Sequence, residues 1–144
     1  MKKIRPHINA LAEFLDIPAE EIQPETYRKH LFDTPAGEYL VLTDSEATAR
    51  ARGKIAELLW AFQTDFIAEM CGFSCNSGAI AALRVMQERC CESCNALIRS
   101  LIVGSCGLSH FCDTAITADG REHFLADYDG VENEQGDYFI YRVN

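Results

Sequence analysis

The chain has 144 residues, and its 22 acidic against 13 basic side chains give a formal net charge of -9 at pH 7. Hydrophobic residues make up 48% and charged residues 24%, a composition typical of a packed globular protein and not of a disordered one. The length predicts a single domain over residues 1–144, with a helical and irregular N-terminal segment at 1–37 and a core at 38–144. An acidic surface repels phosphate backbones, so direct nucleic-acid binding is not expected.

The first half of the chain predicts helices separated by one strand. Apolar residues at helical spacing, proline stops and a run of β-forming residues define these elements. The expected elements are a helix over 7–16, a short helical turn over 18–22, a strand over 38–43, a helix from 44 to about 62 and its continuation over 64–70. Thr43 and Glu46 have the spacing of a capping box at the start of the long helix, and Gly72 ends the continuation.

The second half predicts the longest helix of the chain, over residues 79–103. Its apolar residues recur every three or four positions and predict one continuous helical face: Leu83, Met86, Cys90, Cys94, Leu97 and Leu101. The elements expected after it are a helix over 108–118, a strand over 123–126, a turn at 129–130 and a strand over 138–143. Together they predict an α+β fold, a helix-rich single domain with a small antiparallel sheet of about three short strands.

Seven cysteines are present, and an odd number does not suit a disulfide framework. The N-terminal lysines are not followed by the apolar region of a signal peptide, and no uncharged stretch approaches the ~20 apolar residues that span a bilayer. We therefore expect a cytoplasmic protein with reduced thiols and no membrane association.

Two cysteine pairs, Cys71 with Cys75 and Cys90 with Cys94, have helical spacing and could supply four thiolates to a zinc ion. The alternative is that these residues are core thiols, because free cysteine is among the most buried residue types. We favour core thiols and expect neither a metal nor another cofactor. A zinc-stapled interaction module is the alternative.

A polar C-terminal segment is the main candidate for a functional site. Its candidate residues are Asp119, Arg121, His123, Asp127, Asp129, Glu132 and Glu134. Acids beside a histidine can bind a divalent cation or transfer protons. The simpler interpretation is a turn-rich connection in which Arg121 pairs with nearby acids. Residues 113–144 contain 8 acids and 2 bases against 14 and 11 in residues 1–112, so the acidity concentrates in this segment.

The same segment carries a resemblance to a known family. Residues 119–134 read DGREHFLADYDGVENE, residues 138–144 read YFIYRVN and residues 38–47 read EYLVLTDSEA. These runs resemble a family of small, mostly uncharacterised phage and prophage proteins, over residues 38–144. One difference is Glu122, which stands where the family has glycine. The resemblance implies expression in a bacterial cytoplasm from mobile DNA, and it implies no catalytic residues.

Three functions follow from these features, and we expect a binding protein rather than an enzyme. The preferred one is a phage-type accessory protein that binds a host or phage protein, for example as an inhibitor of a host defence or nucleic-acid-processing system, with its acids facing a basic partner. The second is a small enzyme or cation-binding protein with His123 as base and Asp127 or Asp129 as metal ligand, and the third is the zinc-stapled module. A homodimer is a further expectation if the aromatic strand 138–143 lies at an exposed sheet edge.

Overall fold

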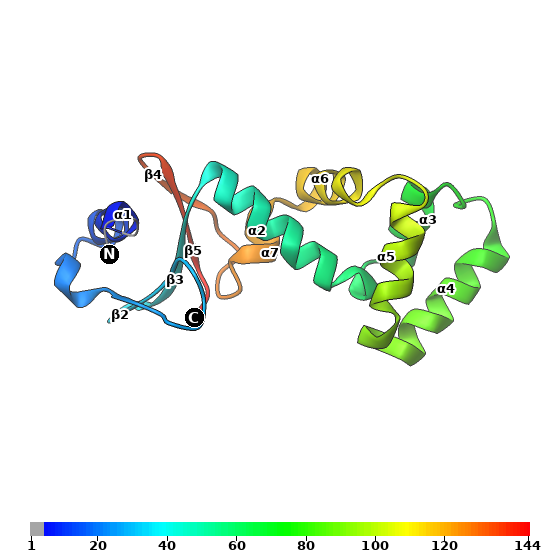
Figure 1. Ribbon diagram of the computed structural model, residues 1–144, viewed down its shortest axis with the longest axis horizontal. Coiled ribbons are helices and arrows are strands. Elements are labelled where there is room, and N and C mark those ends of the chain that lie inside the picture. The colour runs from blue at the N-terminus through cyan, green and yellow to red at the C-terminus, as the bar shows by residue number, and fades with distance from the viewer. Residues whose placement is uncertain (1–4) are drawn as a thin grey trace. The chain divides into compact units, whose positions relative to one another are not determined.

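The computed structural model describes residues 5–144, and it has the α+β fold that the sequence predicts. Helices α1 to α7 accompany one antiparallel sheet (Figure 1). The chain divides into two compact units, which are described separately. We call residues 1–51 with 119–144 the sheet unit, and residues 52–118 the helical unit.

The sheet has five strands rather than the three expected. They are β1 (Gln23–Pro24), β2 (Leu31–Thr34), β3 (Gly37–Thr43), β4 (Asn133–Gln135) and β5 (Tyr138–Arg142), in the order β1-β2-β3-β5-β4 with every neighbouring pair antiparallel. The three unexpected strands, β1, β2 and β4, are two to four residues long and too short for an alternating pattern to mark them. Strand β5 lies between β3 and β4, so the exposed-edge argument for a homodimer does not apply to it.

Strand β3 is central, and its residues Leu40, Val41 and Leu42 are all buried because both faces of the sheet are covered. Helix α1 (Arg5–Leu15), which confirms the first predicted helix, packs on one face. The core on that face is Leu11, Phe32, Tyr39, Val41 and Ile140, with Ala10 and Ile22 beside them. The opposite face carries Leu31, Leu40 and Tyr141, which are side by side in the strand register.

The predicted strand over residues 123–126 is wrong, because this segment is helical. It belongs to α7 (Arg121–Leu125), which contacts β5. Gly120 precedes the helix with φ of 86°, a left-handed conformation that glycine adopts without a steric penalty. Five residues are too few to show a helical period in the sequence. Glu122 lies inside the helix, so the backbone at that position does not require a glycine.

The helical unit contains the remaining helices, and α2 and α6 continue into the sheet unit. The elements are α2 (Asp44–Glu57), α3 (Thr64–Cys71), α4 (Ser77–Cys90), α5 (Asn95–Val103) and α6 (Leu108–Asp119), with short 3-10 turns at Leu59–Ala61 and Cys91–Cys94. A further 3-10 turn, Ala19–Glu21, lies in the sheet unit. The capping box at the start of α2 is confirmed, since the backbone N–H of Thr43 donates to Glu46 Oε1 at 2.8 Å. Helix α2 ends at Glu57, earlier than predicted, and the side chain of Asn95 donates to the carbonyl of Ala56 at 2.8 Å.

The single long helix predicted over residues 79–103 is also wrong. The chain leaves the helical conformation at Cys91, with φ of 47° and ψ of -127°, and α5 starts four residues later. On α5 the buried residues are Ile98 and Ile102, whereas the predicted core residues Leu97 and Leu101 are 64% and 40% exposed. No glycine or proline marks this break in the sequence, and the apolar residues keep their helical spacing across it. The sequence pattern therefore predicted a single helix.

No single helix within residues 5–144 is long and apolar enough to cross a membrane. The segments Ser77–Val103 and Leu108–Asp119 meet the criterion only when taken together, and the chain bends by 104° between them.

Candidate functional site

The candidate residues of the C-terminal segment separate into two groups in the structure. Arg121 and Glu132 turn inward and interact with each other. The other five are exposed to solvent: Asp119, His123, Asp127, Asp129 and Glu134. The segment therefore contains a polar network under an acidic surface.

Arg121 is the centre of the polar network, and its side chain is only 12% exposed. Its guanidinium donates to Glu132 Oε1 at 2.9 Å and to Asp44 Oδ1 at 2.8 Å, and it lies 4.5 Å from the centre of the Phe139 ring. The hydroxyl of Tyr141 also donates a hydrogen bond to Glu132 Oε1. Burial alone would lower the pKa of Arg121, but the hydrogen bonds to the two carboxylates outweigh it and raise that pKa. The network joins the start of α2 to α7 and to the sheet.

The same contacts link two of the three stretches of sequence on which the resemblance was based. Asp44 belongs to residues 38–47, and Arg121 and Glu132 belong to residues 119–134. The interpretation of Arg121 as a partner for nearby acids is therefore confirmed. Its role is to hold these stretches together.

The acid–base site suggested for His123 is not assembled. His123, Asp127 and Asp129 are all exposed, and they do not form a ligand group in the described part of the chain. The ring of His123 lies against Phe124, with the ring centres 4.9 Å apart. Asp129 instead accepts a hydrogen bond from the backbone N–H of Val131 at 3.1 Å, as expected of an aspartate in a turn.

The four-thiolate zinc site is not assembled either. Cys71 lies beside Ser105 and Cys106, and Cys94 lies near Cys90 and Cys91. The break at Cys91 ends the helix that was expected to present Cys90 and Cys94 together, so Cys90 is exposed while Cys94 is buried. Burial raises the pKa of the Cys94 thiol, and it also raises the pKa of Cys71 and of the buried Cys112. These groups are therefore held in the protonated form.

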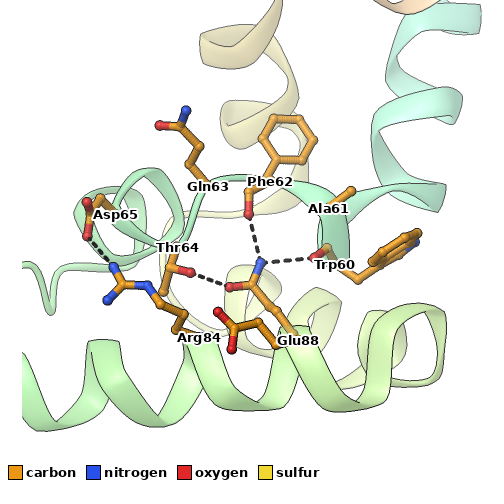
Figure 2. A pocket seen from close by; sticks show the side chains of 9 residues that line it. Trp60, Ala61, Phe62, Gln63, Thr64, Asp65, Arg84 and Glu88 are labelled. Atoms are coloured by element: carbon orange, nitrogen blue, oxygen red, sulfur yellow. Dashed lines mark hydrogen bonds and ion pairs between the residues drawn. The ribbon is translucent and has the colours of Figure 1, made fainter.

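A pocket of about 430 Å³ lies in the helical unit, between the start of α3 and α4 (Figure 2). Gln87 lines it, and its amide nitrogen donates to the carbonyls of Trp60 and Phe62 at 3.0 and 2.7 Å, while its oxygen accepts from the Thr64 hydroxyl at 2.6 Å. At the rim Arg84 pairs with Asp65 at 3.4 Å. Because both donors and the acceptor of the Gln87 amide are used, this residue is a structural clamp between α4 and the segment before α3.

Sequence reasoning missed a buried group of titratable side chains, His7, His30 and Glu46, in the sheet unit. His7 lies in α1, His30 directly precedes β2, and Glu46 lies in the first turn of α2. The Nε2 atom of His7 is 3.0 Å from Glu46 Oε1, and the Nε2 atom of His30 is 3.1 Å from Glu46 Oε2. The two imidazole rings stack with their centres 4.4 Å apart, and each side chain is 7% exposed.

The electrostatics of this group keep the carboxylate ionised. Burial would raise the pKa of Glu46, but the Thr43 N–H and the two histidines favour the anion, and the pKa falls to about 2. An ionised carboxylate only accepts hydrogen bonds, so His7 donates from Nε2, and the Nε2 atom of His30 lies 3.1 Å from the other carboxylate oxygen. Burial lowers the pKa of His30 although Glu46 opposes it, so this ring is neutral near pH 7. Within the described residues the buried Nδ1 atoms of both rings have no hydrogen-bond partner.

No sequence signal marks this group, because its members are 23 and 16 residues apart and follow no ligand spacing. Only the capping-box pattern pointed to Glu46, and it did so for a structural reason. The pairing of β2 with β3 places His30 beside Val41, whose N–H donates to the His30 carbonyl at 3.1 Å, and so brings His30 near the start of α2. No protein-family model, curated protein or solved structure matches this chain. The site must therefore be interpreted from its own geometry.

Proposed function

We propose that the chain is a phage-type accessory protein that acts by binding a protein with a basic surface. The proposed effect is inhibition of a host defence or nucleic-acid-processing system. The observation that carries the proposal is the uncompensated acidity of the surface formed by residues 119–134. We call the exposed Asp119, Asp127, Asp129 and Glu134 the acidic surface.

The bases nearest in sequence do not neutralise the acidic surface. Arg121 and Arg142 are the two bases of residues 113–144, and each is engaged internally. Arg121 pairs with Asp44 and Glu132. Arg142 lies 3.9 Å from the centre of the Tyr128 ring and donates to the carbonyl of Ala36 at 2.7 Å. The outward charge of the segment is therefore negative.

The charge of the sheet unit as a whole supports the same proposal. Residues 1–51 and 119–144 hold 16 acidic and 8 basic side chains, whereas residues 52–118 hold 6 and 5. The net charges are thus -8 and -1, which sum to the -9 of the chain. A charge of this sign and density accelerates the encounter with a basic partner and opposes approach to nucleic acid.

The test compares two triple variants with the same change of charge. Asp127→Asn, Asp129→Asn and Glu134→Gln neutralise the acidic surface, and the amide oxygen introduced at position 129 can still accept the hydrogen bond from Val131. The matched control is Glu13→Gln, Glu20→Gln and Glu21→Gln, three acids elsewhere in the sheet unit. Tagged proteins are incubated with a bacterial lysate at low and high salt, and the captured proteins are quantified by mass spectrometry.

We expect at least one basic protein to be captured by the wild type and by the control variant at low salt. It should be lost with the variant of the acidic surface and released by high salt, because exposed charges are screened beyond about 10 Å at 0.1 M salt. Equal capture by both variants, or capture that salt does not weaken, would contradict the proposal.

A further inference from the structure

We propose that His7, His30 and Glu46 form a binding site for a divalent cation of the zinc class. Two imidazoles and one carboxylate are a ligand set that Zn²⁺ uses when a further coordination position remains open to water. The site is separate from the acidic surface, so it stands independently of the proposed protein-binding function.

The first argument is geometric. Zinc-to-ligand distances of 2.0–2.2 Å in a tetrahedral site place neighbouring ligand atoms about 3.3 Å apart. In this chain the two Nε2 atoms lie 3.0 and 3.1 Å from the two oxygens of Glu46, and all three donor groups lie within 4.8 Å of one another. The stacked rings direct both Nε2 atoms to the same carboxylate. A cation can therefore be bound with small side-chain shifts.

The second argument is charge. Glu46 supplies an acidic ligand between the two imidazoles, with its oxygens 3.0 and 3.1 Å from their Nε2 atoms. The side chain of Glu46 is 32% exposed while those of the histidines are 7% exposed. The open side of the site is thus the side of the carboxylate. The net charge of -8 on the sheet unit favours the approach of a cation.

The position of the N–H on each imidazole ring provides a way to detect the bound cation. Without the cation the Nε2 atom of His7 is hydrogen-bonded to Glu46, and the Nε2 atom of His30 lies 3.1 Å from the other carboxylate oxygen. Coordination uses the Nε2 lone pair, so a bound cation leaves each ring with its N–H on Nδ1. The Nδ1 atoms are the buried nitrogens that have no partner within the described residues. Ligand histidines usually donate from this atom to a further acceptor, so we expect an affinity about 10–100-fold below that of a fully supported zinc site.

The first experiment uses the wild-type side-chain cluster and needs no change to the ligands. The protein carries Cys75→Ser, Cys90→Ser and Cys91→Ser, which remove exposed thiols that would also bind zinc. Nitrogen-15 NMR of the imidazoles is recorded during titration with Zn²⁺. We expect both rings to carry their N–H on Nδ1 when one zinc ion is bound per chain. Rings of His7 and His30 that keep the Nε2–H tautomer at excess Zn²⁺ would overturn the proposal.

The second experiment measures Zn²⁺ affinity by calorimetry and Co²⁺ binding by visible absorption in the same background. His7→Gln, His30→Gln and Glu46→Gln are compared with His110→Gln and His123→Gln, which change exposed histidines. We expect each of the first three to weaken Zn²⁺ binding by at least about tenfold and the two controls to leave it unchanged. Circular dichroism checks that the variants are folded.

The alternative outcomes are distinct. Affinity lost only in the control variants, or retained in a folded His7→Gln/His30→Gln double variant, would overturn the proposal. A thiolate-to-cobalt charge-transfer band would assign the binding to the remaining cysteines and would also overturn it.

Discussion

The two compact units of the chain both have apolar cores, but they differ in the charged groups buried beside them. The interior of the sheet unit contains charged and titratable groups, namely the network around Arg121 and the group of His7, His30 and Glu46. The interior of the helical unit contains a cluster of Phe62, Phe66 and Phe111, whose ring centres lie 5.1 to 5.8 Å apart. All seven cysteines lie in the helical unit, and the net charges of the units are -8 and -1.

This difference indicates how each unit specifies its structure. Apolar packing stabilises any arrangement of side chains that buries enough surface. A buried ion pair or a hydrogen-bonded histidine, by contrast, requires one particular arrangement of its partners. The sheet unit joins segments that are about 75 residues apart in sequence, for example Asp44 and Arg121. Directional polar contacts are suited to selecting that pairing among alternatives.

The largest expected effect concerns the aromatic cluster of the helical unit. Phe111 is fully buried and packs edge to face against Phe62 and Phe66. Phe111→Ala should lower the free energy of unfolding by about 3–5 kcal/mol, because it removes a large side chain and leaves a cavity. Hydrogen exchange followed by mass spectrometry should show lost amide protection in α3 to α6. An equal loss of protection in β3 and β5 would show that the two units unfold as one.

The next largest effect concerns the Arg121 network of the sheet unit. Arg121→Met should lower the free energy of unfolding by about 2–3 kcal/mol, because it leaves Glu132 partly buried without its cation. The matched control is Arg52→Met in the helical unit. Arg52 pairs with Asp113 at 2.7 Å, but their side chains are 45% and 51% exposed, so the cost should stay below about 1 kcal/mol. Urea unfolding measures both. Equal costs would show that the ion pairs of the two units do not differ.

The Arg121 network shows how far the sequence could predict this site. Acids and Arg121 close together in sequence suggested a local ion pair, and that part was correct. The partner Asp44 was out of reach of sequence reasoning, because the pairing of β3 with β5 places it next to α7. The α+β class, the capping box and the first helix were predicted for local reasons, whereas the clear periodicity over 79–103 did not reveal the break at Cys91. Strands of two to four residues and the helix α7 were not, since their formation depends on the neighbours.

The third prediction concerns pH. The folded pKa of Glu46, about 2, is below its ordinary value of 4.5, so its contribution is complete above pH 4.5 and is lost as the pH falls toward 2. The shift corresponds to about 2 kcal/mol after allowance for the 32% exposure of the side chain. The lowered pKa of His30 acts in the same direction, because the unfolded chain binds its proton first below pH 6.5.

The measurement is the urea midpoint between pH 7 and pH 3, followed by circular dichroism. The wild type should lose stability on acidification, and Glu46→Gln should be less stable at pH 7 and lose less between pH 4.5 and 3. Glu69→Gln, an exposed acid of α3, should run parallel to the wild type. A Glu46→Gln curve parallel to that of the wild type would contradict the assigned role of the carboxylate.

The fourth prediction compares the stability contributions of a buried and an exposed cysteine of the helical unit. Cys112 is 1% exposed, and its thiol lies 3.8 Å from the carbonyl of Arg52. Cys112→Ala should lower the free energy of unfolding by about 1 kcal/mol, the cost of removing one buried group of that size. Cys75→Ala changes an exposed residue and should have no measurable effect. A loss for Cys75→Ala as large as that for Cys112→Ala would indicate that this thiol is packed after all.

The smallest expected effect decides between the predicted and the observed core of α5. Helical periodicity assigned Leu97 and Leu101 to the core, whereas the break at Cys91 buries Ile98 and Ile102 instead. Leu97→Gln/Leu101→Gln should therefore change the free energy of unfolding by less than about 0.5 kcal/mol, since both positions are at least 40% exposed. Ile98→Ala on the same helix should cost about 2–5 kcal/mol. A larger loss of stability for the double variant than for Ile98→Ala would contradict the observed core. It would indicate that the helix continues through Cys91 and buries Leu97 and Leu101, as the periodicity predicts.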